Sequence, residues 1–208
     1  MIVRYFTEKL RNCCHFIVPL SISQVKEYFK DGVVMEMQFI TNHLIYDTVI
    51  AGRVPDARKF VWLATSGLKD LYVHKGRRMV PFLEILADLA QSGVSLRLIH
   101  ASEPGPAFRK DFDRYPSLIN GLERILCPRV HFKCVVVDGT FAYSGSANLT
   151  GAGMGAKSVR RRNFESGITT TDPGLIAQIM EQFDGVWMGK ECGACGRKRF
   201  CADYKDLE

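Results

Sequence analysis

The chain has 208 residues, of which 47% are hydrophobic and 24% are charged. These fractions lie near the averages of soluble globular proteins, so they exclude collagen-like, low-complexity and largely disordered chains. At about 150 residues per domain, the length predicts one domain with an extension. The 28 Lys and Arg residues against 22 Asp and Glu residues give a net charge of +6, which favours anionic partners such as nucleic acid or phospholipid headgroups.

The sequence predicts no membrane-spanning segment, because no apolar run approaches the roughly 20 residues that such a helix needs. Charges are scattered through residues 1–12, where a signal peptide would have separate basic and apolar regions. The seven cysteines are an odd number and include the adjacent Cys13 and Cys14, a pattern that fits a disulfide framework poorly. We therefore expect a cytoplasmic protein with reduced thiols.

The first quarter of the chain has no single hydrophobic period. Helical stretches are expected there, interrupted at Pro19 and Gly32. We interpret residues 1–54 as a partly helical N-terminal extension.

A strand–helix–strand pattern follows the extension. Residues 60–64 are a short apolar run of the kind that forms a buried strand. A helix is predicted from Pro81 to the stop signal Gly93, and residues 94–99 form the next strand. This order is a βαβ crossover, which requires the two strands to be parallel. The class is therefore α/β.

The second half of the main domain, which spans residues 55–189, begins with a predicted helix over residues 116–127. Two β-rich runs, 130–137 and 140–144, are separated by Asp-Gly, a strong signal for a hairpin. Three further segments complete the chain: a strand at residues 163–170, a helix that begins at Asp172 and Pro173, and a charged, Cys-rich tail at residues 190–208.

The hairpin brings polar side chains together. With two loop residues, Val137 would pair with Thr140, and side chains at alternate positions would share one face. This register places three pairs opposite each other: His131 with Ser146, Lys133 with Ser144, and Arg129 with Asn148.

Such a patch suits an attack on phosphorus. A neutral imidazole is a competent nucleophile, and an ammonium group with neutral donors can stabilise the charge on phosphate oxygens. Gly145 would let the backbone come close. Because no carboxylate pair that could bind Mg²⁺ lies beside the patch, we expect chemistry without a divalent metal.

The spacing His131-x-Lys133-x4-Asp138-x6-Gly145-Ser146-x-Asn148 resembles the H-x-K-x4-D-x6-G-S-x-N signature of the phospholipase D superfamily. The segment from Asn163 to Gly167 is similar to the N-x-E-x-G strand that follows in this superfamily. The resemblance covers about residues 55–189. It implies a mixed, largely parallel sheet flanked by helices, an α/β/α sandwich.

The resemblance also implies roles for single residues. His131 would be the nucleophile that forms a phosphohistidine intermediate. Lys133, Ser146 and Asn148 would bind the phosphate oxygens, and Glu165 would orient His131 through its second ring nitrogen.

Asp138 belongs to the motif but is expected to have a structural role at the turn. It lies five residues beyond Lys133, roughly 16 Å along a strand, so the two side chains cannot hold one phosphate.

Superfamily members with two motifs use one histidine as the nucleophile and the other as the general acid, but this chain has one motif. The remaining histidines, which are His15, His43, His74 and His100, have no comparable sequence setting. The second imidazole is therefore expected from another copy of the chain across a two-fold axis, in a symmetric homodimer.

Arg160, Arg161 and Arg162 form a basic run between the two segments that carry the motif. Most short charge runs are solvated loops, but a polyanion entering the site would pass this one. We therefore consider these arginines candidates for nucleic-acid contact.

The tail contains Cys192-x2-Cys195-x5-Cys201, which resembles a metal knuckle more than scattered core cysteines. A structural Zn²⁺ or an iron–sulfur cluster would fit, and free thiols are the alternative. Only three ligands are visible, and the candidates for the fourth are Cys13, Cys14, His15, Cys127 and Cys134.

Together these features predict a metal-independent phosphodiesterase, most simply a nuclease acting on DNA or RNA as a homodimer. A phospholipase acting on phospholipid headgroups is the alternative within the enzyme class. A module of the same fold that binds nucleic acid without cutting it is the alternative outside that class. Cleavage assays in EDTA, with His131→Ala as control, separate the three.

Overall fold

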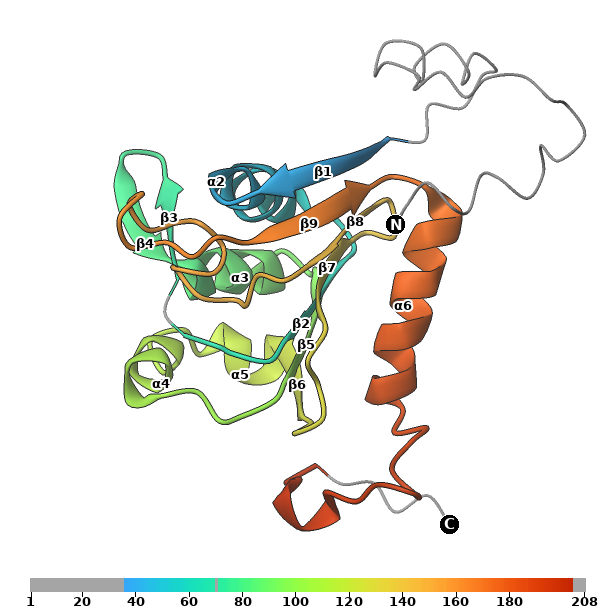
Figure 1. Ribbon diagram of the computed structural model, residues 1–208. Coiled ribbons are helices and arrows are strands. Elements are labelled where there is room, and N and C mark those ends of the chain that lie inside the picture. Colours follow the sequence, from blue (N-terminus) through green and yellow to red (C-terminus); the bar gives the residue numbers. More distant parts are fainter. Residues whose placement is uncertain (1–35, 70, 204–208) are drawn as a thin grey trace, which may run out of the picture. The chain divides into compact units, whose positions relative to one another are not determined.

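The computed structural model describes residues 36–69 and 71–203 (Figure 1). The expectations for Cys13, Cys14 and His15 lie outside these ranges. The described part belongs to one compact unit, whose boundary falls between Val34 and Met35. Within this part, no helix combines the length and the apolar character that crossing a membrane requires.

A seven-stranded sheet forms the centre of this unit, with strand order β1-β9-β8-β7-β2-β5-β6. Its strands are β1 (Met37–Thr41), β2 (Phe60–Thr65), β5 (Ser95–His100), β6 (Leu122–Leu126), β7 (Lys133–Val137), β8 (Phe141–Gly145) and β9 (Ser166–Thr170). The pairings β2–β5 and β5–β6 are parallel, and the other four are antiparallel. The mixed α/β class is confirmed. The parallel part of the sheet is smaller than expected, because β7 and β8 pair in antiparallel orientation with their neighbours.

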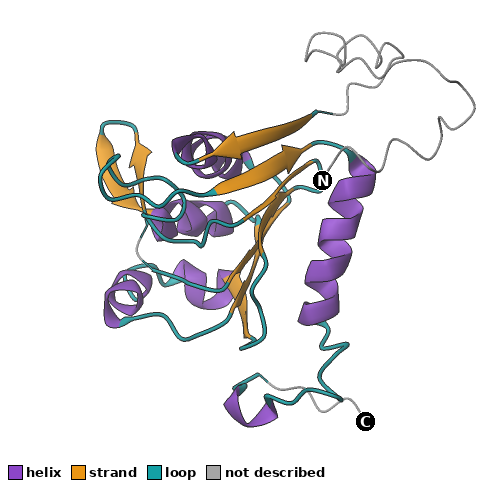
Figure 2. Ribbon diagram, viewed as in Figure 1, coloured by secondary structure: helices purple, strands orange, loops and turns teal. Residues whose placement is uncertain are grey.

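Helices cover both faces of the sheet (Figure 2). The helices are α2 (His43–Ile45), which continues as a π-helix (Tyr46–Arg53), then α3 (Phe82–Gln91), α4 (Pro106–Phe112), α5 (Ser117–Gly121) and α6 (Pro173–Trp187). Short 3₁₀ turns lie at Val54–Asp56 and Lys198–Phe200.

The two core layers follow from the alternation of side chains along the strands. Leu63 and Leu98 face one layer, where they pack with residues of α3, α4 and α5. Trp62 and Ile99 face the other layer, where α6 packs with Phe183 at its centre. The predicted βαβ unit is confirmed as β2-α3-β5, and the last helix begins as predicted, with Asp172 accepting a hydrogen bond from the Leu175 N–H at 2.6 Å.

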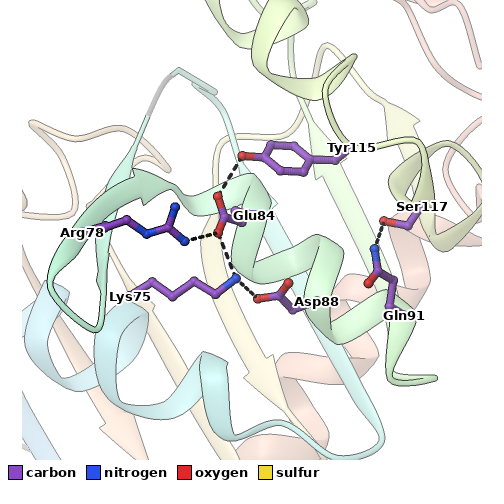
Figure 3. A network of polar contacts seen from close by, with 7 residues as sticks. All are labelled: Lys75, Arg78, Glu84, Asp88, Gln91, Tyr115 and Ser117. Atoms are coloured by element: carbon purple, nitrogen blue, oxygen red, sulfur yellow. Dashed lines mark hydrogen bonds and ion pairs between the residues drawn. The ribbon is translucent and has the colours of Figure 1, made fainter.

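A small hairpin, β3 (Tyr72–Lys75) and β4 (Arg78–Pro81), is fastened to α3 by polar contacts (Figure 3). Lys75 Nζ lies 2.9 Å from Glu84 Oε1 and 2.6 Å from Asp88 Oδ2. The Tyr115 hydroxyl donates to Glu84 Oε2 at 3.2 Å. These charges are partly exposed and paired within the network, which gives them a structural role.

Residues 36–54 differ from the expected N-terminal extension, because they contribute to the core of the main domain. β1 pairs with β9, and Ile45, Val49 and Ile50 are completely buried. β1 is an edge strand in which only Ile40 is buried, so its sequence lacks the alternation that would identify a strand. The expectation for residues 1–35 lies outside the described ranges.

Residues 122–126 form β6 rather than the second half of the predicted helix. Leu122 and Leu126 are buried, and their spacing of four fits one helix face as well as two positions on a strand. β6 pairs in parallel with β5, and Glu123 forms an ion pair with Arg97 of β5 at 2.9 Å. The local sequence pattern is compatible with a helix and with a strand, and pairing with β5 makes this segment a strand.

The β7–β8 hairpin has the predicted turn but a register shifted by one residue. Asp138 and Gly139 both have positive φ, 55° and 69°, and the Thr140 N–H donates to the Val137 carbonyl at 3.0 Å. Thr140 is then an extra residue, since Val137 pairs with Phe141. As a result Lys133 lies opposite Gly145 instead of Ser144.

Candidate active site

The candidate catalytic residues gather at one edge of the large sheet. β2 ends there at Thr65 and β8 at Gly145, while β7 begins at Lys133 and β9 at Ser166. The segments next to these strand ends carry the other motif residues: His131, Ser146, Asn148 and Glu165.

His131 and Lys133 are in contact at this edge. His131 is exposed just before β7, and Lys133 Nζ lies 3.5 Å from its Nε2 atom and donates to its backbone carbonyl oxygen at 2.6 Å. Lys133 is only 6% exposed. Burial lowers the pKa of its ammonium group, and the negative charge of Glu165 partly offsets this effect.

Glu165 contacts Ser146. Its carboxylate accepts hydrogen bonds from the Ser146 hydroxyl and, at 3.0 Å, from Nδ2 of Asn163. The Ser166 N–H donates to Ser146 Oγ at 3.1 Å, so the hydroxyl is held from two sides. Among the described side chains, no hydrogen bond joins Glu165 to His131, and the orienting role implied by the resemblance stays a prediction.

Asn148 is fixed by the loop that follows β2. Its Oδ1 atom accepts hydrogen bonds from the Ser66 hydroxyl at 2.8 Å, the Gly67 N–H at 3.0 Å and the Thr65 hydroxyl at 3.3 Å. Because the carbonyl oxygen is fully engaged, the Nδ2 group is the one with which Asn148 can donate to a phosphate oxygen.

Sequence reasoning missed Asn42, which supports the segment of Glu165 from the end of β1. Its N–H donates to the Glu165 carbonyl at 2.9 Å, and its side-chain oxygen accepts from the Glu165 N–H at 3.1 Å. Asn42 has φ 51°, a value that asparagine tolerates better than most residues. A single asparagine gives no such signal in a sequence.

Two glycines of the motifs are neighbours across β8 and β9. Gly145 pairs with Gly167, and the ring of Tyr143 is completely buried against both. A Cβ atom at either position would lie within 3.0 Å of Tyr143 and of backbone on the neighbouring strand. The glycines thus allow the close approach of the strands that brings Ser146 to Glu165.

Asp138 lies at the opposite end of β7 from Lys133. Its carboxylate accepts backbone N–H donors of Arg58, Lys59 and Phe60 at 2.7–2.9 Å. Partial burial alone would raise the pKa of Asp138, but these hydrogen bonds together lower it. This geometry holds the start of β2 against the hairpin turn, away from the other motif residues.

The arginine run lies in the loop between β8 and β9. Arg160 and Arg161 are exposed and Arg162 is partly buried. Phe164 follows the run, directly before Glu165, and is 98% exposed. Sequence reasoning missed Phe164 as a candidate contact, although an aromatic residue in a polar loop is itself a signal.

The tail cysteines Cys192, Cys195 and Cys201 are partly exposed free thiols. Across residues 36–69 and 71–203, no three His, Cys, Asp or Glu side chains stand at metal-ligand spacing. The predicted knuckle is therefore not assembled by these three residues as they lie. Cys134, one candidate for a fourth ligand, is buried in the core beside α6.

Comparison with known proteins identifies the family. A family model described as "Cardiolipin synthase, PLD-like domain" matches residues 53–187. The mitochondrial cardiolipin hydrolase of Chlamydomonas reinhardtii is 27% identical over 105 residues, which are 50% of this chain and 44% of that protein. The chain thus matches less than half the length of this curated relative.

Solved structures share the fold. Nuc of Salmonella typhimurium, a phospholipase D family member, has a TM-score of 0.55 and 15% identity, covering 74% of this chain and 94% of its own. NucT of Helicobacter pylori has a TM-score of 0.50 and 16% identity, covering 72% and 94%. TrmBL2, an archaeal chromatin protein, has a TM-score of 0.51 and 12% identity, covering 79% and 57%.

These structural likenesses concern the fold alone, whereas the family model spans more than half of the chain. The matched residues include both motifs and the strands that position them. The chain therefore belongs to the PLD-like domain family of the phospholipase D superfamily.

Proposed function

We propose that the chain is a metal-independent phosphodiesterase that cleaves DNA or RNA through a phosphohistidine intermediate. The observation that carries this proposal is the contact between Lys133 Nζ and His131 Nε2 at the sheet edge. A nucleophilic nitrogen thus lies beside a cation that the chain itself supplies, and the Nδ2 group of Asn148 is a neutral donor at the same sheet edge.

The reaction has two steps. In the first, His131 Nε2 attacks phosphorus, an N–P bond forms, and the P–O bond to the leaving alcohol breaks as that oxygen takes a proton from a general acid. In the second, water attacks phosphorus, the N–P bond breaks, and the general acid regains a proton. Lys133 and the Asn148 Nδ2 group stabilise the charge on the non-bridging oxygens in both steps.

Nucleic acid as the substrate is supported by charge and by the loop before β9. The net charge is +6, and the loop exposes Arg160 and Arg161 near Phe164. Arginines can contact backbone phosphates, and an exposed aromatic ring can stack on a base. Together they form a surface for a single-stranded segment beside Glu165.

The homodimer in this proposal supplies the general acid. Within the described ranges, His100 is buried and its Nδ1 atom lies 2.9 Å from the Ser102 carbonyl oxygen, and His43 lies 3.2 Å from Asp47. His74 lies in the small β3–β4 hairpin. We therefore assign the general acid to His131 of a second copy across a two-fold axis.

A phospholipase is the second candidate function, favoured by the likeness to a protein named as a cardiolipin hydrolase. The exposed ring of Phe164 would then enter the lipid interface rather than stack on a base. The same catalytic residues would attack a phospholipid headgroup.

One assay separates these functions. The full chain and His131→Ala are incubated in EDTA with single-stranded DNA, double-stranded DNA, RNA and cardiolipin-containing vesicles. Cleavage of a nucleic acid by the wild type alone supports the proposal, and release of a lipid product alone supports the phospholipase. Retention of nucleic acid on a gel without cleavage, both in EDTA and in buffer without chelator, would indicate a binding module. Activity that disappears in EDTA and returns with Mg²⁺ would contradict metal independence.

A mixing experiment tests the shared site. Heterodimers of wild type and His131→Ala are isolated with two affinity tags. The proposal predicts that they lose nearly all activity, because each site needs both imidazoles. Half the activity of the wild-type dimer in these heterodimers would show that each subunit works alone.

A further inference from the structure

Cys127 joins the three tail cysteines around one cavity. Cys127 follows β6, whereas Cys192, Cys195 and Cys201 follow α6, some 65 residues or more later in the chain. All four line a cavity of about 190 Å³. All four are partly exposed free thiols. Two segments that are distant in the sequence thus place four cysteines around the same cavity.

Backbone hydrogen bonds place Cys192 and Cys195 in one turn, although their sulfur atoms are not at metal-ligand spacing. The Cys195 N–H donates to the Cys192 carbonyl at 3.0 Å, which closes the turn between the two cysteines. The Arg197 N–H donates to Cys195 Sγ at 3.4 Å. A backbone donor aimed at sulfur favours the thiolate, the form that binds metal.

Hydrogen bonds already hold the tail against the segment that contains Cys127. Cys201 Sγ donates to the Leu126 carbonyl at 3.3 Å, and the Leu126 N–H donates to Asp203 Oδ2 at 2.7 Å. Both hydrogen bonds end on Leu126, so the tail is held at the residue directly before Cys127, which lies four residues before His131.

The tail has little apolar packing to fix it. Phe200, the only large apolar side chain in residues 189–203, is 60% exposed, and Met188 is 57% exposed. Short segments without a hydrophobic core commonly depend on a structural metal for their order. A metal bound in the cavity between the tail and the turn after β6 would give the tail this order.

We propose that Cys127, Cys192, Cys195 and Cys201 bind one Zn²⁺ as four thiolates. Four thiolates in a tetrahedral arrangement are a common structural zinc site, with a Cys-x2-Cys pair supplying two ligands. The sulfur atoms are not at ligand spacing in the described chain, so each side chain turns about its single χ1 bond toward the cavity on binding. The centre fixes the turn that leads from β6 to His131.

The first test is metal content. The full chain is purified in reducing buffer without added metal, and zinc and iron are measured per chain. We expect one zinc, lost in Cys127→Ser, Cys192→Ser, Cys195→Ser and Cys201→Ser. Cys134→Ala is the matched control, because Cys134 lies in the core layer that packs against α6. This variant should keep its zinc.

Three results would overturn the proposal. They are wild-type protein without zinc, iron with acid-labile sulfide in place of zinc, and full zinc content in Cys127→Ser. The last result, combined with loss in a Cys13→Ser, Cys14→Ser double variant, would move the fourth ligand to the N-terminal segment.

A second measurement is independent of variant folding. Zinc is removed from the wild type with a chelator, and amide hydrogen exchange is followed before and after. We expect faster exchange at residues 127–130 and 190–203, reversed by Zn²⁺ but not by Mg²⁺. Unchanged exchange would contradict the proposal. His131→Ala should bind zinc normally, so the result does not depend on the proposed enzymatic activity.

Discussion

Lys133 Nζ lies 3.5 Å from His131 Nε2 and is held there by a hydrogen bond to the His131 carbonyl oxygen. The lysine side chain is buried, whereas the imidazole is exposed. The imidazole that we propose as the nucleophile is thus open to a substrate, and the ammonium group of Lys133 is shielded from water. Shielding strengthens its attraction to a phosphate, but it also makes the charged form of Lys133 costly.

Lys133→Met should therefore stabilise the fold while removing activity. We expect the midpoint of urea unfolding at pH 7 to rise, since a desolvated charge is replaced by an apolar chain of similar length. The cleavage rate should fall by about 10²–10³, as for loss of one group that stabilises transition-state charge. Unfolding curves and initial rates measure both effects, and a variant that is both active and less stable would contradict the assignment.

The lowered pKa of Lys133 sets the sign of the pH dependence. Between its folded pKa and the ordinary value of 10.5, the unfolded chain binds more protons, so this group makes stability rise with pH in that window. Activity should fall in the same window as the ammonium group is lost. Lys133→Arg, which stays charged, should show no such decline in whatever activity it retains.

Asn148→Asp should distinguish the proposed role of Asn148 in binding phosphate from its role in supporting the loop after β2. The aspartate oxygens can still accept from Ser66, Gly67 and Thr65, so the fold should keep its stability. The donor toward phosphate is replaced by a negative charge, and the rate should fall at least about 10²-fold. Asn148→Ala, in contrast, removes the acceptor of the Ser66 hydroxyl and the Gly67 N–H, whereas the Thr65 hydroxyl keeps the Gly67 carbonyl at 2.8 Å. This change should cost about 1–3 kcal/mol in chemical unfolding. Equal activity of Asn148→Asp and wild type would refute the role of Nδ2.

Asp138→Ala should lower stability with little effect on the turnover of folded protein. Three backbone donors lose their acceptor, a loss of about 1–3 kcal/mol in unfolding experiments. Because the folded pKa of Asp138 is lowered, its stabilisation is present above the unfolded value of 3.8 and is lost as pH falls through the folded pKa. The difference in stability between wild type and variant should shrink in acid. A catalytic defect at full stability would instead place Asp138 in the reaction.

The combined change Arg160→Ala, Arg161→Ala and Arg162→Ala should weaken nucleic-acid binding and flatten its salt dependence. Each arginine that contacts a phosphate contributes about 0.7–0.9 to the slope of log affinity against log salt. Binding titrations at several salt concentrations measure the slope. A matched triple change of exposed charges at the opposite end of the sheet, Arg53, Arg58 and Lys59 to Ala, should leave the slope unchanged. An unaltered slope in the first variant would exclude the loop from the interface.

Much of the fold follows from local sequence, and the exceptions share a cause. The apolar run of β2 and the stripe of α6 identify themselves by period, whereas residues 122–126 fit two periods equally. Residues 122–126 form a strand because they pair with β5, and β5 lies too far away in the sequence for a local pattern to reveal this pairing.

The candidate site could likewise be predicted only in part from the sequence. The spacing of the motif selects His131, Lys133 and Asn148, and the structure brings them to one sheet edge. The hairpin register is different, because Thr140 is extra and Ser146 N–H bonds to Ser166 of β9. The partners of Glu165, and the support from Asn42, depend on strands that are distant in the chain.

The most direct measurement of the central claim is to trap the covalent intermediate. The protein is mixed with a cleavable substrate, quenched under conditions that preserve phosphoramidates, and digested for mass spectrometry. We predict a phosphoryl adduct on His131 in the wild type and none in His131→Ala. Substrate cleavage with the adduct on another residue, or with no adduct at any time, would contradict the account.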